Sequence, residues 1–129
     1  MKKEKIQLEY LIRTSSKILY TLISTPSGLS EWFADDVNVS NNVFTFFWDG
    51  SEEQATLLNK KRDAFTRFRW KSDEEDGNDC FFEFRIKIDD ITNEVALIVT
   101  DFAEPDEQEE TAALWNSQVD NLKHVLGSW

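Results

Sequence analysis

TAALWNSQVDNLKHVL, residues 111–126, is the stretch of sequence that decides the fold. Its apolar side chains recur at spacings of three and four, which places them on one stripe of an α-helix: Ala112, Trp115, Val119, Leu122 and Leu126. Asp106 and Glu109 have the spacing of a capping box, and Gly127 provides a helix stop. The pattern predicts one amphipathic helix from Glu109 to Leu126, about 27 Å long, which must bury its stripe against another element.

Aromatic-rich strands are predicted to fill the middle of the chain. The clearest alternates apolar and polar residues from Cys80 to Asp89, which indicates one buried and one wet face. Further strands are predicted at residues 6–12, 37–39, 43–48, 54–60, 64–71 and 94–102. Asp49-Gly50 is a strong two-residue hairpin signal. This alternation is typical of an antiparallel sheet.

Two short helices are predicted after the first strand. Thr14 or Ser15 would cap the first helix. Thr25 followed by Pro26 would begin the second, which runs to about Phe33. The resulting order is α+β: a curved antiparallel sheet of six to seven strands wrapped around a long C-terminal helix. Because no repeat or Pro/Gly-rich linker divides the sequence, we expect one domain over residues 1–129.

Three segments carry a resemblance to a known family: TPSGLSEWF (25–33), FRW (68–70) and LWNSQVDNLK (114–123). With the element order, they make the chain similar to the START-like or SRPBCC superfamily of helix-grip proteins. Within it, the chain resembles the branch that contains the C-terminal domain of the heat-shock chaperone activator. The resemblance covers nearly the whole chain and implies a single START-like domain whose sheet grips the long helix.

Charge and composition exclude several kinds of partner and site. The formal net charge is −11, so nucleic acids and anionic membrane surfaces would be repelled. The acidic runs 73–76 and 104–110 are interpreted as solvated loops or a helix start. Cys80 and His124 are the sole residues of their types, which excludes cysteine-based and histidine-cluster metal sites. We therefore expect no cofactor, no metal and no membrane insertion. Without a signal peptide pattern, a cytoplasmic location is expected.

The candidate ligand-binding residues are the side chains expected to converge between sheet and helix. They are Trp32, Phe33, Phe46, Trp48, Phe68, Trp70, Phe82, Phe84, Trp115, Val119 and Leu122. Ten Phe and five Trp supply large rigid rings, which either interdigitate or leave voids. The sequence leaves both outcomes open: a solid core, or an apolar pocket in which indole N–H groups orient a polar group of the ligand.

Charged residues near this region give no confident catalytic group. Asp35–Asp36 would lie at the mouth of the pocket and is interpreted as a turn or cap, with a ligand role as the alternative. Lys60–Arg62, a basic cluster, is interpreted as a solvated hairpin tip, with a partner contact as the alternative. Arg67 and Arg69 should point away from the core, because they alternate with inward-facing rings.

Three functions therefore compete. The first is non-catalytic binding of a small hydrophobic ligand, such as a lipid, beneath the C-terminal helix. The second, implied by the resemblance, is a protein-interaction module like a chaperone-ATPase activator, with an unidentified protein partner. The third is a cyclase-like enzyme, which would need an acid or base facing the cavity. A buried carboxylate or arginine facing the helix would favour the third.

Overall fold

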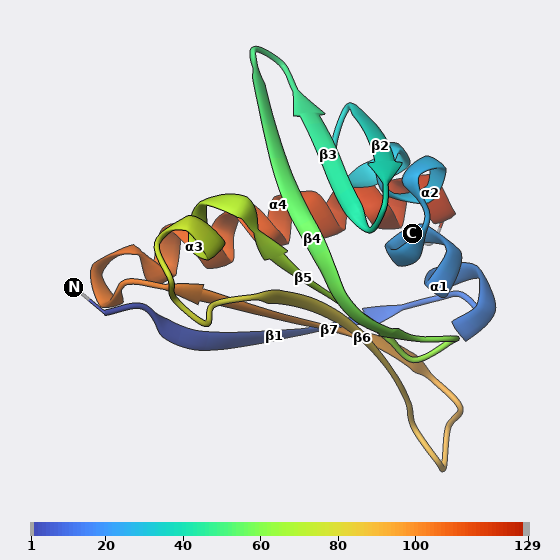
Figure 1. Cartoon of the computed structure of the whole chain (residues 1–129). Helices are drawn as coiled ribbons and strands as arrows, with labels where there is room; N and C mark the ends of the chain where they lie inside the picture. Colours follow the sequence, from blue (N-terminus) through green and yellow to red (C-terminus); the bar gives the residue numbers. More distant parts are fainter. Residues whose placement is uncertain (1, 128–129) are drawn as a thin grey trace.

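One curved sheet and a long helix dominate the structure (Figure 1). Within residues 2–127, which the computed structural model describes, seven antiparallel strands form the sheet in the order β1-β7-β6-β5-β4-β3-β2. The strands are β1 (Glu4–Ile12), β2 (Asp36–Ser40), β3 (Val43–Trp48), β4 (Ser51–Lys61), β5 (Phe65–Trp70), β6 (Phe82–Ile88) and β7 (Val95–Ala103). The helices are α1 (Ser16–Ser24), α2 (Pro26–Trp32), α3 (Lys71–Glu75) and α4 (Gln108–Leu126), with a 3-10 turn, Pro105–Glu107, before α4.

Helix α4 lies across the concave side of the sheet, with α1 and α2 packed near its C-terminal end (Figure 1). The predicted α+β helix-grip arrangement is confirmed. Trp115 is 5% exposed, and Val119 and Leu122 are fully buried, so the predicted stripe faces the sheet. Gly127 ends the helix in the left-handed conformation, as expected. Strand β3 has the predicted bounds.

Side-chain caps fix the two short helices. Ser15, rather than Thr14, caps α1, because its Oγ accepts a hydrogen bond from the Ile18 N–H at 3.1 Å. Thr25 caps α2 by accepting from the Gly28 N–H at 2.9 Å, while its hydroxyl donates to the Thr21 carbonyl at 2.8 Å. The same threonine therefore ends one helix and begins the next, which fixes the angle between them.

One prediction about the acidic segments was wrong. Asp106 does not cap α4, because Pro105 starts a 3-10 turn that takes Asp106 into its interior, and the helix begins at Gln108 without a side-chain cap. The acidic run after Trp70, interpreted as a solvated loop or a helix start, lies largely in α3. Asp73 in that helix is buried, where it accepts hydrogen bonds from Asn78 at 3.1 Å and Lys3 at 3.4 Å.

The convex face of β6 is also less wet than its alternation predicts. Glu83 points to this face yet is buried, because Arg67 and Arg85 lie over it and donate hydrogen bonds to its carboxylate at 2.7–3.3 Å. The two guanidinium groups in turn cover the rings of Phe81 and Phe65 at 4.4 and 4.3 Å. Desolvation alone would raise the pKa of Glu83, but the two arginines outweigh it and hold that pKa below its ordinary value.

Candidate functional site

A pocket of about 370 Å³ opens between α4 and the concave face of the sheet. We call it the α4 pocket. Its walls come from the end of α2, from strands β3, β4, β5 and β7, and from α4 itself. The lining residues are Phe33, Trp48, Ser51, Glu53, Trp70, Asp101, Leu114, Trp115 and Gln118. Aromatic rings therefore form much of its wall, with a few polar groups among them.

Four of the predicted ligand-binding residues line the α4 pocket: Phe33, Trp48, Trp70 and Trp115. Six others lie beneath it in the core and are fully buried: Phe46, Phe68, Phe82, Phe84, Val119 and Leu122. Their rings pack closely, as in the stacked pair Phe68–Phe82 at 5.1 Å between centroids. The space between sheet and helix is thus filled at its centre and open at one end.

The pocket wall is held in place by hydrogen bonds to one carbonyl. The Phe33 carbonyl, just after α2, accepts from Trp48 Nε1 at 2.9 Å and from Gln118 Nε2 at 3.2 Å. The Phe33 ring stacks on Trp115, with centroids 5.7 Å apart and planes 13° apart. These contacts join α2, β3 and α4 at the pocket, so its shape is set by the fold rather than by a loop.

Asp101 is the polar residue that sequence reasoning missed. It lies on the concave face of β7, where its Oδ2 accepts from Trp115 Nε1 at 2.8 Å and its Oδ1 from the Phe102 N–H at 2.8 Å. Burial raises the pKa of Asp101 above its ordinary value, and the two hydrogen bonds offset this only in part. The period-two pattern of Val95, Leu97 and Val99 continues to residue 101, a signal that would have placed this carboxylate inside.

The carboxylate of Asp101 bears directly on the enzyme alternative, because it faces the helix from a buried position. Proton transfer needs a group free to approach a substrate atom. Both Asp101 oxygens instead receive donors from the protein. Among the described residues that line the α4 pocket, the other titratable side chain is Glu53, which is exposed. Asp101 is therefore a carboxylate held at a fixed position beside aromatic rings.

Asp101→Asn should change how stability depends on pH. A carboxyl whose pKa is raised by folding favours the folded state at low pH, and this contribution is lost as pH rises through the raised pKa. We therefore expect the variant to gain stability relative to the natural protein between pH ~4 and pH ~7.5. Urea unfolding of both proteins at these two pH values measures the difference. A difference that does not change with pH would contradict the placement of Asp101.

A second, shallower hollow of about 630 Å³ adjoins the first and shares Phe33, Trp48, Leu114 and Gln118 with it. Trp32, the remaining predicted ligand-binding residue, lines this outer hollow, as does Asp35. Asp36 lines neither hollow. It is the first residue of β2, where it pairs with Phe47 and its Oδ1 accepts from the Val37 N–H at 2.9 Å, so the predicted turn or cap was wrong for this residue. The basic cluster Lys60–Arg62 lies where β4 ends and the chain turns to β5, as predicted.

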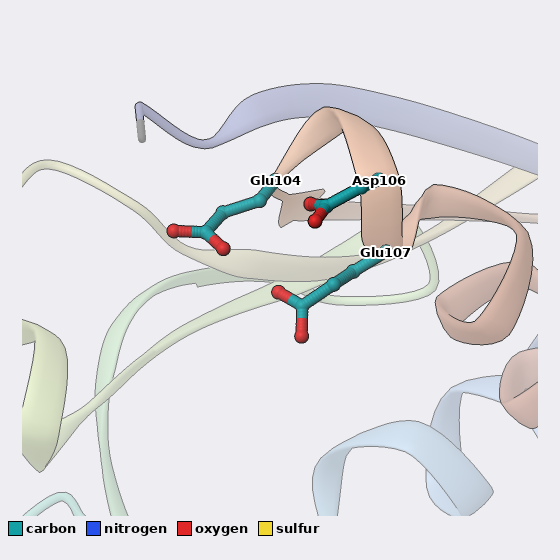
Figure 2. Close-up of side chains that lie close together, drawn as sticks. All are labelled: Glu104, Asp106 and Glu107. Atoms are coloured by element: carbon teal, nitrogen blue, oxygen red, sulfur yellow. The ribbon is translucent and has the colours of Figure 1, made fainter.

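Three carboxylates gather just before α4, as Figure 2 shows. Those of Glu104, Asp106 and Glu107 have oxygen atoms within 4.8 Å of one another. The charge of Glu104 raises the pKa of Glu107, which is the expected result of crowding like charges. Negative charge also suits the start of a helix. We assign no metal-binding role to this cluster, because exposed acidic groups at such a position are accounted for by the helix.

Within residues 2–127, none of the helices combines the length and apolarity needed to cross a bilayer.

Comparisons with known proteins agree with this architecture. A family model described as the START-like superfamily domain matches residues 1–128. The solution structure of BfR322 from Bacteroides fragilis is 41% identical, with a TM-score of 0.68, and the match covers 98% of this chain and 93% of that one. No curated protein matches the chain.

More distant structures share the fold alone. The Aha1 dimer from Colwellia psychrerythraea is 16% identical with a TM-score of 0.78, and the match covers 93% of each chain. ChR145 from Cytophaga hutchinsonii is 17% identical with a TM-score of 0.73, and the match covers 98% of this chain and 97% of that one.

Proposed function

The chain belongs to the START-like superfamily, and from that premise we propose that it binds a small apolar ligand in the α4 pocket without transforming it. Folds of this kind commonly bind hydrophobic ligands. The observation that carries the proposal is the pocket wall: Phe33, Trp48, Trp70 and Trp115 line a pocket with a volume of about 370 Å³. Concave, largely aromatic sites of roughly 300–1,000 Å³ are the usual form of small-molecule sites.

The filled core limits the size of the ligand. Because the rings beneath the pocket are fully buried, a ligand occupies the open end and does not extend under the length of α4. Burial of roughly 200 Å² of apolar ligand surface would contribute about 5 kcal/mol, at ~25 cal/mol per Å². A gain of about 5 kcal/mol corresponds to a Kd of roughly 0.2 mM before the cost of association is subtracted, so we expect affinities no tighter than that.

The proposal is tested with N-phenyl-1-naphthylamine, a neutral apolar dye whose fluorescence rises when it leaves water. We expect saturable binding to the natural protein. Ser51→Trp should weaken it at least tenfold, because Ser51 lines the α4 pocket and an indole there would occupy it. Gln54→Trp is the matched control, since Gln54 is an exposed residue of the same strand paired with Thr45 on the opposite face. Equal binding by both variants, or no saturable binding at all, would refute the proposal.

A protein-interaction role is the second candidate, and it is favoured by exposed apolar side chains beside α4. Leu114 and Val125 of α4 are 61% and 42% exposed, and Ile18 of α1 is 53% exposed. Ile18 and Val125 line the same shallow hollow. Under this candidate, adding the protein would raise the ATPase rate of a heat-shock chaperone, and Val125→Glu would abolish the effect. An ATPase rate unchanged by the natural protein would exclude it.

A further inference from the structure

The α4 pocket is electrostatically one-sided. Of the nine described residues that line it, Glu53 and Asp101 are acidic and none is basic. Glu53 reaches the pocket because it lies on the concave face, opposite Phe46 in the β3–β4 ladder. The two carboxylates therefore approach the opening from β4 and β7. The formal net charge of −11 adds a negative field around the whole molecule.

The nearby cations are engaged outside the pocket. Arg67 and Arg85 bind Glu83 on the convex face. Arg69 donates to the carbonyls of Cys80 at 2.8 Å and Asp79 at 3.2 Å. Lys3, whose charge acts on Asp101, forms its ion pair with Asp73 at 3.4 Å. The negative charge that faces the α4 pocket is thus not paired by a basic side chain of its own lining.

The aromatic wall strengthens this preference for positive charge. Trp48 and Trp70 lie 6.2 Å apart between centroids, inclined at 54°, and both are half-buried, so part of each indole remains open. Indole faces carry negative potential and attract a cation within about 6 Å of the centroid. Aromatic rings combined with a carboxylate therefore offer two kinds of attraction to the same charge.

We propose that the α4 pocket selects organic ammonium ions, in which a positively charged nitrogen is joined to a small apolar body. The nitrogen lies with the indoles of Trp48 and Trp70 on one side and the Asp101 carboxylate on the other. Glu53 lies at the entrance, and the apolar body of the ligand contacts Phe33 and Trp115. This inference rests on the proposed function and names its ligand class. A metal ion fits the site less well, because it requires several oxygen ligands and gains little from indole walls.

The test compares two probes of the same shape that displace N-phenyl-1-naphthylamine. One is benzyltrimethylammonium and the other is neopentylbenzene, in which a carbon atom replaces the charged nitrogen. We expect the cation to bind at least tenfold more tightly than its neutral isostere, and added salt to narrow the difference. Equal affinities, or tighter binding of the neutral probe, would overturn the inference.

Substitutions test whether the preference for the cation over its neutral isostere arises in the α4 pocket. Asp101→Asn should reduce the preference for the cation to about threefold or less. Glu53 is exposed, so Glu53→Gln should leave the fold intact. It should reduce the preference for the cation about two- to fivefold. Glu52→Gln is the charge-matched control, because Glu52 pairs with Phe47 on the opposite face of β4, and it should leave the preference unchanged. A preference that survives both pocket substitutions, or that Glu52→Gln lowers equally, would overturn the inference.

Failure of the two proposals would look different. If the dye binds and Ser51→Trp blocks it, but the ammonium ion has no advantage, the apolar binding site stands and the cation preference is wrong. If the dye does not bind, both are wrong.

Discussion

Trp115→Ala is expected to destabilise the protein by about 3–5 kcal/mol, the range for removal of a buried aromatic ring. The ring is 5% exposed, stacks on Phe33 and meets Phe84 edge-on at 5.6 Å between centroids. Its Nε1 also donates to Asp101, which would lose that partner. Thermal unfolding should show a decrease in Tm of about 10 °C or more.

Two companion variants separate the causes. Trp115→Phe keeps a ring but removes the donor to Asp101, and should cost about 1–3 kcal/mol. Leu114→Ala changes the neighbouring residue on the exposed side of α4 and should stay within about 0.5 kcal/mol. Equal, small effects of Trp115→Ala and Leu114→Ala would mean that α4 does not bury its stripe against the sheet.

Gly28→Ala is expected to destabilise the protein by about 3 kcal/mol, at the upper end of the usual range for overpacking. An added Cβ would lie 2.2 Å from the Thr21 carbonyl oxygen and 2.8 Å from the Leu22 Cα. Both are backbone atoms, so relief requires α1 and α2 to separate. Because α2 delivers Phe33 to the α4 pocket, separation should also weaken dye binding.

Urea unfolding and dye titration of the same samples measure both effects. Ser27→Ala, an exposed neighbour on α2, is the control and should change neither. Gly28→Ala with natural stability would contradict the close crossing of α1 and α2.

Much of the fold follows from local patterns in the sequence. The stripe of α4 and the alternation in β3 and β6 are long, regular signals, and each gives both an element and its buried face. Thr25-Pro26 marks a helix start because a hydroxyl cap and a fixed φ satisfy the same helix end. These features depend on neighbours in the sequence, so they can be recognised without the structure.

The features that sequence analysis missed depend on contacts between distant residues. Glu83 is buried because two arginines cover it, and Asp73 is buried because α3 folds toward Lys3. Asp101 belongs to the candidate site only because α4 brings Trp115 above it. Local charge patterns indicate solvent exposure for Glu83 and Asp73, and tertiary packing overrides them, whereas the alternation along β7 does place Asp101 on the inner face.

The candidate site shows the same limit. The predicted aromatic residues fall at the spacings expected for the buried face of a strand or helix, so the sequence predicts that they turn inward. Whether a ring fills the core, as Phe82 does, or lines the opening, as Trp70 does, depends on how far α4 extends over it.

The most direct test of the central claim is an NMR titration of the ¹⁵N-labelled protein with N-phenyl-1-naphthylamine, observing the indole N–H signals. Binding in the α4 pocket predicts saturable shifts for Trp48, Trp70 and Trp115, which line it, and much smaller shifts for Trp32, whose N–H is buried against the Leu22 carbonyl. The side-chain Nε–H signals of Arg67 and Arg85, which bind Glu83 on the convex face, should not move. Shifts centred on the convex face, or no shifts at the three pocket indoles at saturating dye, would contradict the account.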